Sequence, residues 1–174
     1  MYKRQDQTLI VDNKDKTQST TKSPGLHLAW DVPYAPGILK AVAKKNGQVV
    51  ATDEIHTAGE PASITLTPDR TQLTADGQDL SFIKVTILDK DGNVCPNADN
   101  EIEFAVKGTA AGLAGVDNGD ATNHEFFQGP QHKAFHGLAL AVLKTHYDAT
   151  GPVTLTASSA GLPSVTATVN VAAP

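Results

Sequence analysis

Apolar and polar positions alternate with a period of two along most of this chain, in short runs separated by Gly, Pro, Asn and Asp. At residues 101–106, for example, Ile102, Phe104 and Val106 are expected to point inward, whereas Glu101 and Glu103 are expected to point outward. A period of two places alternate side chains on opposite faces of a strand, so that one face can cover a core. Further strands of this kind are expected at 63–67, 80–88, 153–157 and 165–171. The pattern predicts an all-β sandwich.

The first sixty residues predict a smaller β unit. Strands are expected at 8–11, 26–32, 38–44 and 49–56, and Asn46-Gly47 between the last two is a strong hairpin signal. Residues 12–25 are polar throughout and are expected to form a loop or to be partly disordered. Trp30 alternates with Leu28 and Val32, which favours a core position over a sugar-stacking surface.

Residues 137–144 are ambiguous between strand and helix. Leu138, Leu140 and Val142 alternate with Ala139, Ala141 and Leu143, so both faces of a strand would be apolar, and Ala and Leu also favour helices. Because the run is short and is bracketed by Gly137 and Gly151-Pro152, we interpret it as a buried strand.

The domain organisation follows from these runs. We expect a partial small β-sandwich domain at residues 6–58 and a second β-sandwich domain at residues 59–174, with the junction in the segment 57–62 (TAGEPA). Residues 1–5, Met-Tyr-Lys-Arg-Gln, match one reading frame of a common transposase sequencing adapter. We interpret them as an artefact and expect the natural protein to extend further upstream.

Composition narrows the possible partners. The 174 residues include 14 Lys and Arg and 19 Asp and Glu, for a formal net charge of −5, which argues against nucleic acid and a basic membrane anchor. No apolar run approaches the roughly 20 residues of a membrane-spanning helix, and no signal peptide follows Met1. The single Cys95 excludes an intramolecular disulfide, and we interpret it as a small apolar residue before Pro96.

No catalytic or metal centre emerges from the sequence. Residues 89–93, Asp-Lys-Asp-Gly-Asn, resemble the start of a calcium-binding loop. The sixth position of such a loop is glycine and the twelfth an acid, but these positions are Val94 and Asn100 here, so a hairpin turn is the better interpretation. His124, His132 and His136 lack the spacing of a zinc site and are expected to make ordinary hydrogen bonds. We therefore expect no metal and no cofactor.

Glycoside hydrolysis needs two carboxylates held on either side of a sugar. Glu101 and Glu103 lie on one strand face and are expected to be solvated, while Glu125 lies in a loop beside His124 without a second carboxylate. The chain is also shorter than the about 250 residues of an eight-fold βα barrel. We expect no catalytic residue in this chain.

The segment from Gly115 to Gly137 is too long for a simple hairpin loop and carries three phenylalanines among polar residues. It is either a contact surface for a neighbouring domain or a sugar, or a loop packed on its own aromatic side chains. Both interpretations can hold. The candidate binding residues are Asp117, Asn118, His124, Glu125, Phe126, Phe127, Lys133 and Phe135.

Several motifs carry a resemblance to a known family. Residues 73–82 (LTADGQDLSF), 91–98 (DGNVCPNA), 115–119 (GVDNG) and 133–137 (KAFHG) resemble the final immunoglobulin-like domain of glycoside hydrolase family 2 β-galactosidases. Residues 30–37 (WDVPYAPG) with 57–59 (TAG) resemble the small β-domain that precedes it. The resemblance covers about residues 26–172 and implies two immunoglobulin-like β-sandwich modules, the first incomplete.

The resemblance implies a parent enzyme that hydrolyses terminal β-galactosides with two glutamates in an upstream barrel, neither of which has a counterpart here. These modules would then brace the barrel or wall its cleft, in an extracytoplasmic setting. Two alternatives stay open. Asp76-Gly77 and residues 89–98 also resemble bacterial immunoglobulin-like adhesin repeats, and Phe126, Phe127 or Trp30 could form the stacking platform of a carbohydrate-binding module.

Overall fold

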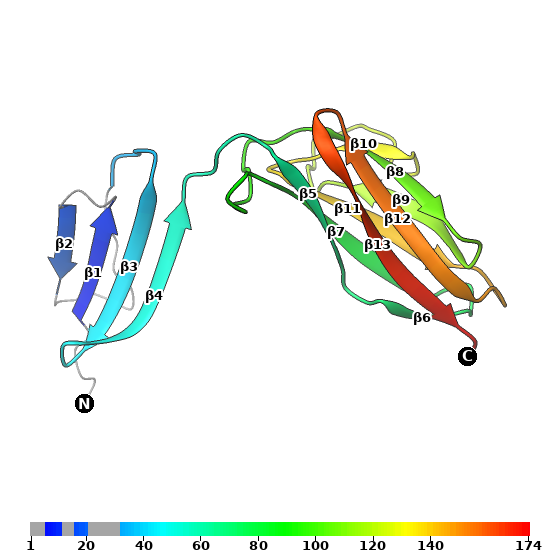
Figure 1. Ribbon diagram of the computed structural model, residues 1–174, viewed down its shortest axis with the longest axis horizontal. Coiled ribbons are helices and arrows are strands. Elements are labelled where there is room, and N and C mark those ends of the chain that lie inside the picture. Colours follow the sequence, from blue (N-terminus) through cyan, green and yellow to red (C-terminus); the bar gives the residue numbers. More distant parts are fainter. Residues whose placement is uncertain (1–5, 12–15, 21–31) are drawn as a thin grey trace. The chain divides into compact units, whose positions relative to one another are not determined.

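The computed structural model describes residues 6–11, 16–20 and 32–174. The chain divides into two compact units, Met1–Thr57 and Ala58–Pro174. Every regular element of the described residues is a β-strand, and these strands form three sheets (Figure 1). The predicted all-β class is therefore confirmed.

The first unit is built on a four-stranded sheet in the order β2-β1-β3-β4. Its strands are β1 (Asp6–Val11), β2 (Lys16–Thr20), β3 (Ile38–Lys45) and β4 (Gln48–His56). The prediction of a loop at residues 12–25 was wrong for β2, because this segment forms an edge strand that pairs antiparallel with β1. Its sequence Lys-Thr-Gln-Ser-Thr is polar, but threonine fits a pleated edge that need not bury a face. The strand expected at 26–32, with the core position of Trp30, lies outside the described residues apart from Val32.

The hairpin between β3 and β4 turns at the expected Asn46-Gly47 pair. The backbone φ angles of Asn46 and Gly47 are 53° and 78°, both in the left-handed region. A two-residue turn with positive φ at both positions matches the right-handed twist of the strands that it joins.

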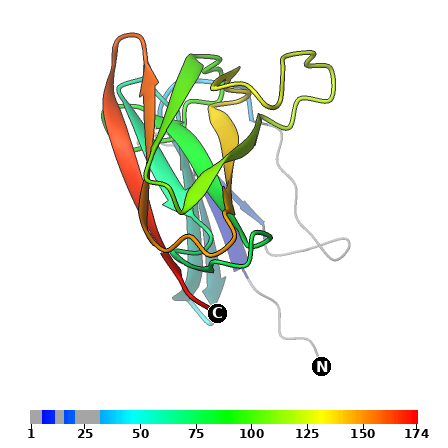
Figure 2. The same cartoon turned by 90° about the vertical axis from the view of Figure 1, so that its right-hand side faces the viewer.

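The second unit is a sandwich of two sheets (Figures 1 and 2). One has the order β10-β8-β12-β13-β6 and the other β5-β7-β11-β9. Their strands are β5 (Ser63–Pro68), β6 (Gln72–Thr74), β7 (Leu80–Leu88), β8 (Glu101–Lys107), β9 (Ala111–Asp117), β10 (Gln131–Lys133), β11 (Leu138–Thr145), β12 (Gly151–Ser159) and β13 (Leu162–Ala172).

The core of the sandwich takes one side chain in two from each sheet, as the alternation predicts. Ile102 on β8 is fully buried, whereas Glu101 and Glu103 are exposed. On β11 the buried set is Ala139, Ala141 and Leu143, and Leu138, Leu140 and Val142 point the other way. Residues 137–144 thus form a strand, as interpreted. Each large apolar side chain buried in this way stabilises the fold by roughly 1.5–3 kcal/mol.

Three strands of the second unit, β6, β9 and β10, were not predicted from the sequence. β9 (Ala-Gly-Leu-Ala-Gly-Val-Asp) offers small residues in place of a clear alternation, and β6 and β10 are too short to show one. Taking Gly115–Gly137 as a single irregular segment was therefore wrong, because it starts inside β9 and contains β10. Its irregular part is the loop at residues 118–130 and the turn at 134–137.

Candidate functional site

The loop at residues 118–130, called the contact loop below, projects from the sandwich between β9 and β10 (Figure 2). Its C-terminal part is fixed by two backbone hydrogen bonds. The Val116 amide donates to the Phe127 carbonyl at 2.7 Å, and the Phe104 amide donates to the Pro130 carbonyl at 2.7 Å. The loop is thus attached to β9 at one point and to β8 at another.

Side-chain oxygens organise the first half of the contact loop. Asp117 Oδ1 accepts the Asn118 and Gly119 amides at 2.7 and 3.1 Å. Asn118 Oδ1 accepts the Asp120 amide at 2.9 Å. Asp120 in turn accepts the Thr122 amide, a bond that holds the pKa of Asp120 below its usual range. Short Asn and Asp side chains favour this local bonding and give the loop a defined path without regular structure.

The second half of the contact loop is anchored by Glu125. Its Oε2 accepts the Lys133 amide at 2.9 Å, and this bond holds the pKa of Glu125 below its usual range. The same oxygen lies 3.3 Å from Nδ1 of His132. The Glu125 amide donates to Asn123 Oδ1 at 2.6 Å. The carboxylate therefore ties the loop to β10 and acts as a structural acceptor.

His132 is the buried partner of this anchor. Its side chain is fully buried, and its ring stacks on Phe127 with centroids 5.9 Å apart and planes 19° from parallel. Nδ1 lies 3.1 Å from the Lys133 carbonyl. Because the Lys133 carbonyl and the Glu125 carboxylate only accept hydrogen bonds, Nδ1 is the donor in both contacts. Nε2 is buried without a hydrogen-bond partner.

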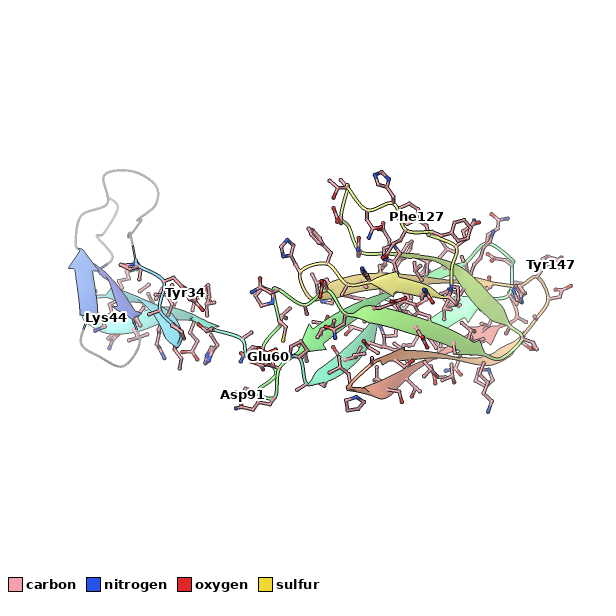
Figure 3. All side chains as sticks on the ribbon, turned by 90° about the horizontal axis from the view of Figure 1, so that it is seen from above. Tyr34, Lys44, Glu60, Asp91, Phe127 and Tyr147 are labelled. Atoms are coloured by element: carbon pink, nitrogen blue, oxygen red, sulfur yellow. The ribbon has the colours of Figure 1, made fainter. Side chains whose placement is uncertain are left out.

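The candidate residues from the sequence fall into three groups. Asp117, Asn118, Glu125 and Phe127 build the contact loop and its anchor, and Lys133 contributes its amide and its carbonyl, which accepts from Asn118 Nδ2 at 3.1 Å. His124 and Phe126 lie exposed on the loop, with Phe126 72% exposed. Phe127, labelled in Figure 3, is 49% exposed. Phe135 lies outside the loop, in the turn after β10.

Sequence reasoning missed Asp120, Asn123 and the structural role of His132. The alternation of His132 and Ala134 with exposed Gln131 and Lys133 was a short period-two signal for a buried histidine. The described residues contain no group of three or more His, Cys, Asp or Glu side chains that could hold a metal, so His124, His132 and His136 do not form a ligand set there.

The turn at residues 134–137 joins distant parts of the sandwich. His136 has a φ of 52°, and its Nδ1 donates to the Pro96 carbonyl at 2.9 Å. Gly137 has a φ of 74°, and a Cβ there would lie 2.3 Å from the Cys95 carbonyl oxygen. The Gly137 amide donates to the Ala98 carbonyl at 2.9 Å. The Lys-Ala-Phe-His-Gly motif therefore locks the β7–β8 connection against the start of β11.

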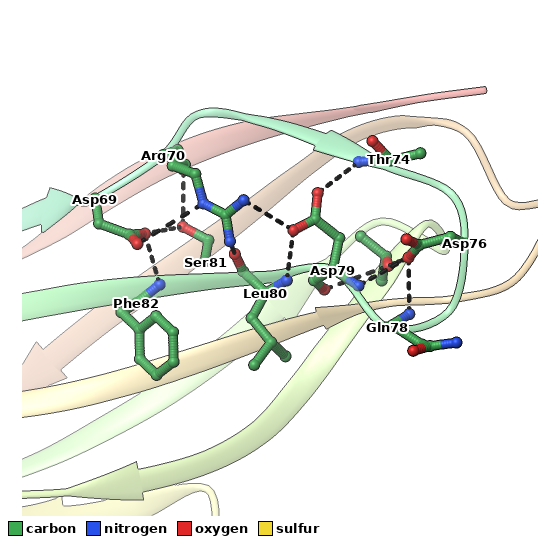
Figure 4. Close-up of polar contacts among 10 residues, drawn as sticks. Asp69, Arg70, Thr74, Asp76, Gln78, Asp79, Leu80, Ser81 and Phe82 are labelled. Atoms are coloured by element: carbon green, nitrogen blue, oxygen red, sulfur yellow. Dashed lines mark hydrogen bonds and ion pairs between the residues drawn. The ribbon is translucent and has the colours of Figure 1, made fainter. Parts of the chain in front are cut away.

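Two aspartate-rich turns have the same structural character. In Figure 4, Asp76 accepts the amides of Gln78 and Asp79, both at 2.8 Å, and these bonds lower the pKa of Asp76. Asp79 accepts the Thr74 amide at 2.9 Å and pairs with Arg70 at 3.0 Å. These contacts fix the connection between β6 and β7.

The second turn is the Asp-Lys-Asp-Gly-Asn sequence, which forms the expected turn after β7. Asp89 is 3% exposed and accepts the amides of Gly59, Asp91 and Asn93 at 2.8, 2.9 and 2.8 Å. The Gly59 amide above all, together with Asn93, holds the pKa of Asp89 far below its usual range. Asp89 thus fastens the entering chain to the sandwich.

A shallow groove of about 470 Å³ lies between β9 and the turn after β11. Its lining has no carboxylate and consists of Gly77, Gly112, Leu113, Ala114, Lys144, Thr145, His146 and Tyr147. Figure 3 shows Tyr147 at this end of the unit.

The part of the chain that the structure describes has no helix long and apolar enough to cross a membrane.

The sandwich and its motifs define a class of protein domain. The family model "Glycoside hydrolase family 2 C-terminal domain 5" matches residues 64–168, and the chain belongs to this family. A domain family of unknown function matches residues 8–51. The resemblance inferred from the motifs is therefore confirmed.

Particular relatives agree with this assignment. The chain is 46% identical over 154 residues to the β-galactosidase BoGH2A of Bacteroides ovatus, a match that covers 88% of this chain and 18% of that protein. A family 2 glycosyl hydrolase from Bacteroides cellulosilyticus superposes with a TM-score of 0.87 at 30% identity, covering 96% of this chain and 21% of its own. A β-glycosidase from Bacteroides vulgatus gives 0.83 at 32% identity, covering 95% and 21%. The chain thus spans about a fifth of the length of these proteins.

Proposed function

We propose that this chain is the non-catalytic C-terminal accessory part of a β-galactosidase-type glycoside hydrolase, and that it braces or walls the catalytic barrel. The observation that carries the proposal is the 46% identity to a β-galactosidase over nearly the whole chain but only 18% of that relative. A segment that makes up about a fifth of such a relative fits a role in support of a larger body that performs the chemistry.

The use of the acidic side chains supports a structural role. Asp76 and Asp120 accept backbone amides of their own turns, Asp89 also accepts the Gly59 amide, and Glu125 accepts the Lys133 amide of β10. Hydrolysis of a glycoside requires two carboxyl groups that face a sugar across roughly 5–10 Å. Carboxylates that are committed to turn amides serve the fold, so the catalytic pair is expected in the upstream part of the enzyme.

Enzyme assays on two proteins test this function. The full-length gene product is expected to hydrolyse a chromogenic β-galactoside, and purified residues 6–174 are expected to be inactive. Activity of residues 6–174 would overturn the accessory role. A full-length product that hydrolyses β-glucuronides but no β-galactoside would overturn the substrate class and leave the accessory role intact.

We also propose that the contact loop touches a neighbouring domain or a glycan. Its support is the exposure of Phe126, 72%, on a loop whose path is fixed by its own hydrogen bonds. A rigid exposed aromatic ring is the usual anchor for a partner surface or a pyranose face. Calorimetric glycan binding that is lost in Phe126→Ala but kept in His124→Ala would assign the loop to sugar. If the Phe126 side chain is instead shielded from solvent by the upstream domain in the full-length protein, the contact loop is assigned to contact with that domain.

We propose in addition a location for the full-length protein, which rests on the resemblance to glycoside hydrolase family 2 β-galactosidases. The full-length protein is expected outside the cytoplasm. Cell fractionation with an antibody against residues 58–174 tests this, and a purely cytoplasmic signal would contradict it.

A further inference from the structure

The sheet β5-β7-β11-β9 has an unusual solvent-facing side. The register of β7 with β11 pairs Phe82 with Val142, Lys84 with Leu140, and Ile83 with Ala141. Ile83 and Ala141 are fully buried in the core. Side chains one position away from them along each strand therefore point out of the sandwich. We call this side of β7 and β11 the outer face, and its residues are Leu80, Phe82, Lys84, the buried Thr86, Leu138, Leu140, Val142 and Lys144.

The outer face is mostly apolar. Phe82 and Leu138 are 42% and 39% exposed, and Leu80, Leu140 and Val142 are half-buried. These side chains are neighbours, because Phe82 lies opposite Val142 and Leu140 lies between Val142 and Leu138 on one strand. In Figure 4 the side chains of Leu80 and Phe82 extend from the same side of β7. Contiguous apolar surface of this kind marks a contact site in a soluble domain.

The other sheet provides a comparison within the same unit. Its central strand β12 places Thr154, Thr156 and Ser158 outward, between the buried Val153, Leu155 and Ala157. Its neighbour β8 places Glu101 and Glu103 outward. That sheet shows the usual pattern of an antiparallel sheet with one face in water, whereas β11 has the two-sided apolar pattern of a strand that is covered on both faces.

We propose that the outer face packs against an upstream domain of the same longer polypeptide. The match to a C-terminal domain family and the 18% coverage of BoGH2A place most of such a protein before this chain. The inference rests on the proposed function in one respect: it requires that an upstream domain exists in the same polypeptide. It assigns the contact to the sheet, in addition to the contact loop.

Charge argues against a second copy of the chain as the occupant. Lys84 lies opposite Leu140, and Lys144 lies opposite Leu80, so lysines are interspersed with the apolar side chains. A two-fold interface brings the same patch of both copies together, so the lysines of both copies would be buried in one interface that has few acidic side chains to pair with them. Asp117, opposite Leu140 on β9, has one carboxylate oxygen bound to the Asn118 and Gly119 amides. The face fits a partner with an apolar centre and acidic side chains around it.

Cysteine labelling tests the proposal directly. Leu140→Cys reports on the outer face, and Thr156→Cys is the matched control, because both positions are half-buried and lie on interior strands of their sheets. The native Cys95 is buried, and burial raises the pKa of its thiol, so it reacts slowly with a maleimide. Labelling is followed by mass spectrometry of the modified peptides in residues 1–174 and in the full-length gene product.

We expect Leu140→Cys to label readily in residues 1–174 and at least about tenfold more slowly in the full-length product, while Thr156→Cys labels alike in both. Equal labelling of Leu140→Cys in the two proteins would overturn the proposal. Protection that weakens on dilution would overturn it in favour of a second copy. Protection already complete in residues 1–174 and independent of concentration would overturn it in favour of the first unit.

A stability measurement gives an independent readout. Leu140→Lys is expected to leave the melting temperature of residues 1–174 nearly unchanged and to lower that of the full-length product by several degrees, with Thr156→Lys neutral in both. An equal effect of Leu140→Lys in both proteins would contradict domain packing. Neither readout uses catalysis, so a wrong substrate class would leave this test intact.

Discussion

Gly137 shows at the scale of one residue why the Lys-Ala-Phe-His-Gly motif ends in glycine. Its φ of 74° favours glycine, and a Cβ would lie 2.3 Å from the Cys95 carbonyl oxygen. Gly137→Ala is expected to cost more than about 2 kcal/mol of unfolding free energy. Gly161→Ala is the control, because its φ is 79° but no atom lies within 4 Å of the added Cβ, and it should cost about 1 kcal/mol. Urea denaturation measures both, and equal losses would contradict the steric argument.

Asp89 makes a second prediction at this scale, which concerns pH. The pKa of its carboxyl is lower in the folded chain than in the unfolded chain, since the Gly59 amide and Asn93 stabilise the anion. Its contribution to stability is therefore present above the usual Asp pKa of about 4 and is lost as the pH falls further. Asp89→Asn should lower the melting temperature clearly at pH 7 and progressively less toward pH 2. The control Asp91→Asn removes an exposed charge, and a difference that did not shrink in acid would contradict the assignment.

At the scale of elements, the contact loop depends on one carboxylate that joins it to β10. Glu125→Ala removes the acceptor of the Lys133 amide while leaving the core untouched. Hydrogen exchange at residues 118–130 and at the Lys133 amide should become about tenfold faster, with little change in β7, β8 or β11. Glu125→Gln keeps an acceptor oxygen and should be intermediate, and the exposed Gln128→Ala should have no effect. Faster exchange throughout the sandwich would show that the loop is part of the cooperative fold.

The elements also show how far sequence reasoning reaches. β8 could be predicted, because Ile102 and Phe104 alternate with exposed glutamates and burial of one face is a local signal. β9 could not, because its Ala and Gly residues fit either face, and β2 could not, because a polar edge strand has no buried side. In the site, exposed Phe126 was readable from a long polar segment. The anchor of Glu125 to the Lys133 amide was not, because it depends on where β10 brings the backbone.

At the scale of the whole molecule, the second unit has the features of a domain that folds independently, namely a core of its own and a fixed N-terminal boundary. Among the residues that the structure describes, its core cluster, which includes Ile83, Ile102 and Leu155, is drawn from positions after Ala58. Asp89 holds Gly59 at the point where the chain enters, so the unit keeps its own boundary when preceding residues are removed. A domain with its own core and a hydrogen-bonded N-terminal boundary is expected to unfold as a single cooperative unit.

Residues 58–174 alone should therefore show one cooperative thermal transition, within a few degrees of the corresponding transition in the 174-residue chain. Starting instead at Pro61 removes Gly59 and leaves the buried Asp89 carboxylate without that amide, which should lower the midpoint. Calorimetry of the three proteins at pH 7 compares them, and a repeat at low pH should bring the two shortened chains together, because a protonated Asp89 has less to gain from the Gly59 amide. A broad transition in residues 58–174, beside a sharp one in the full chain, would show that the sandwich depends on the residues before it.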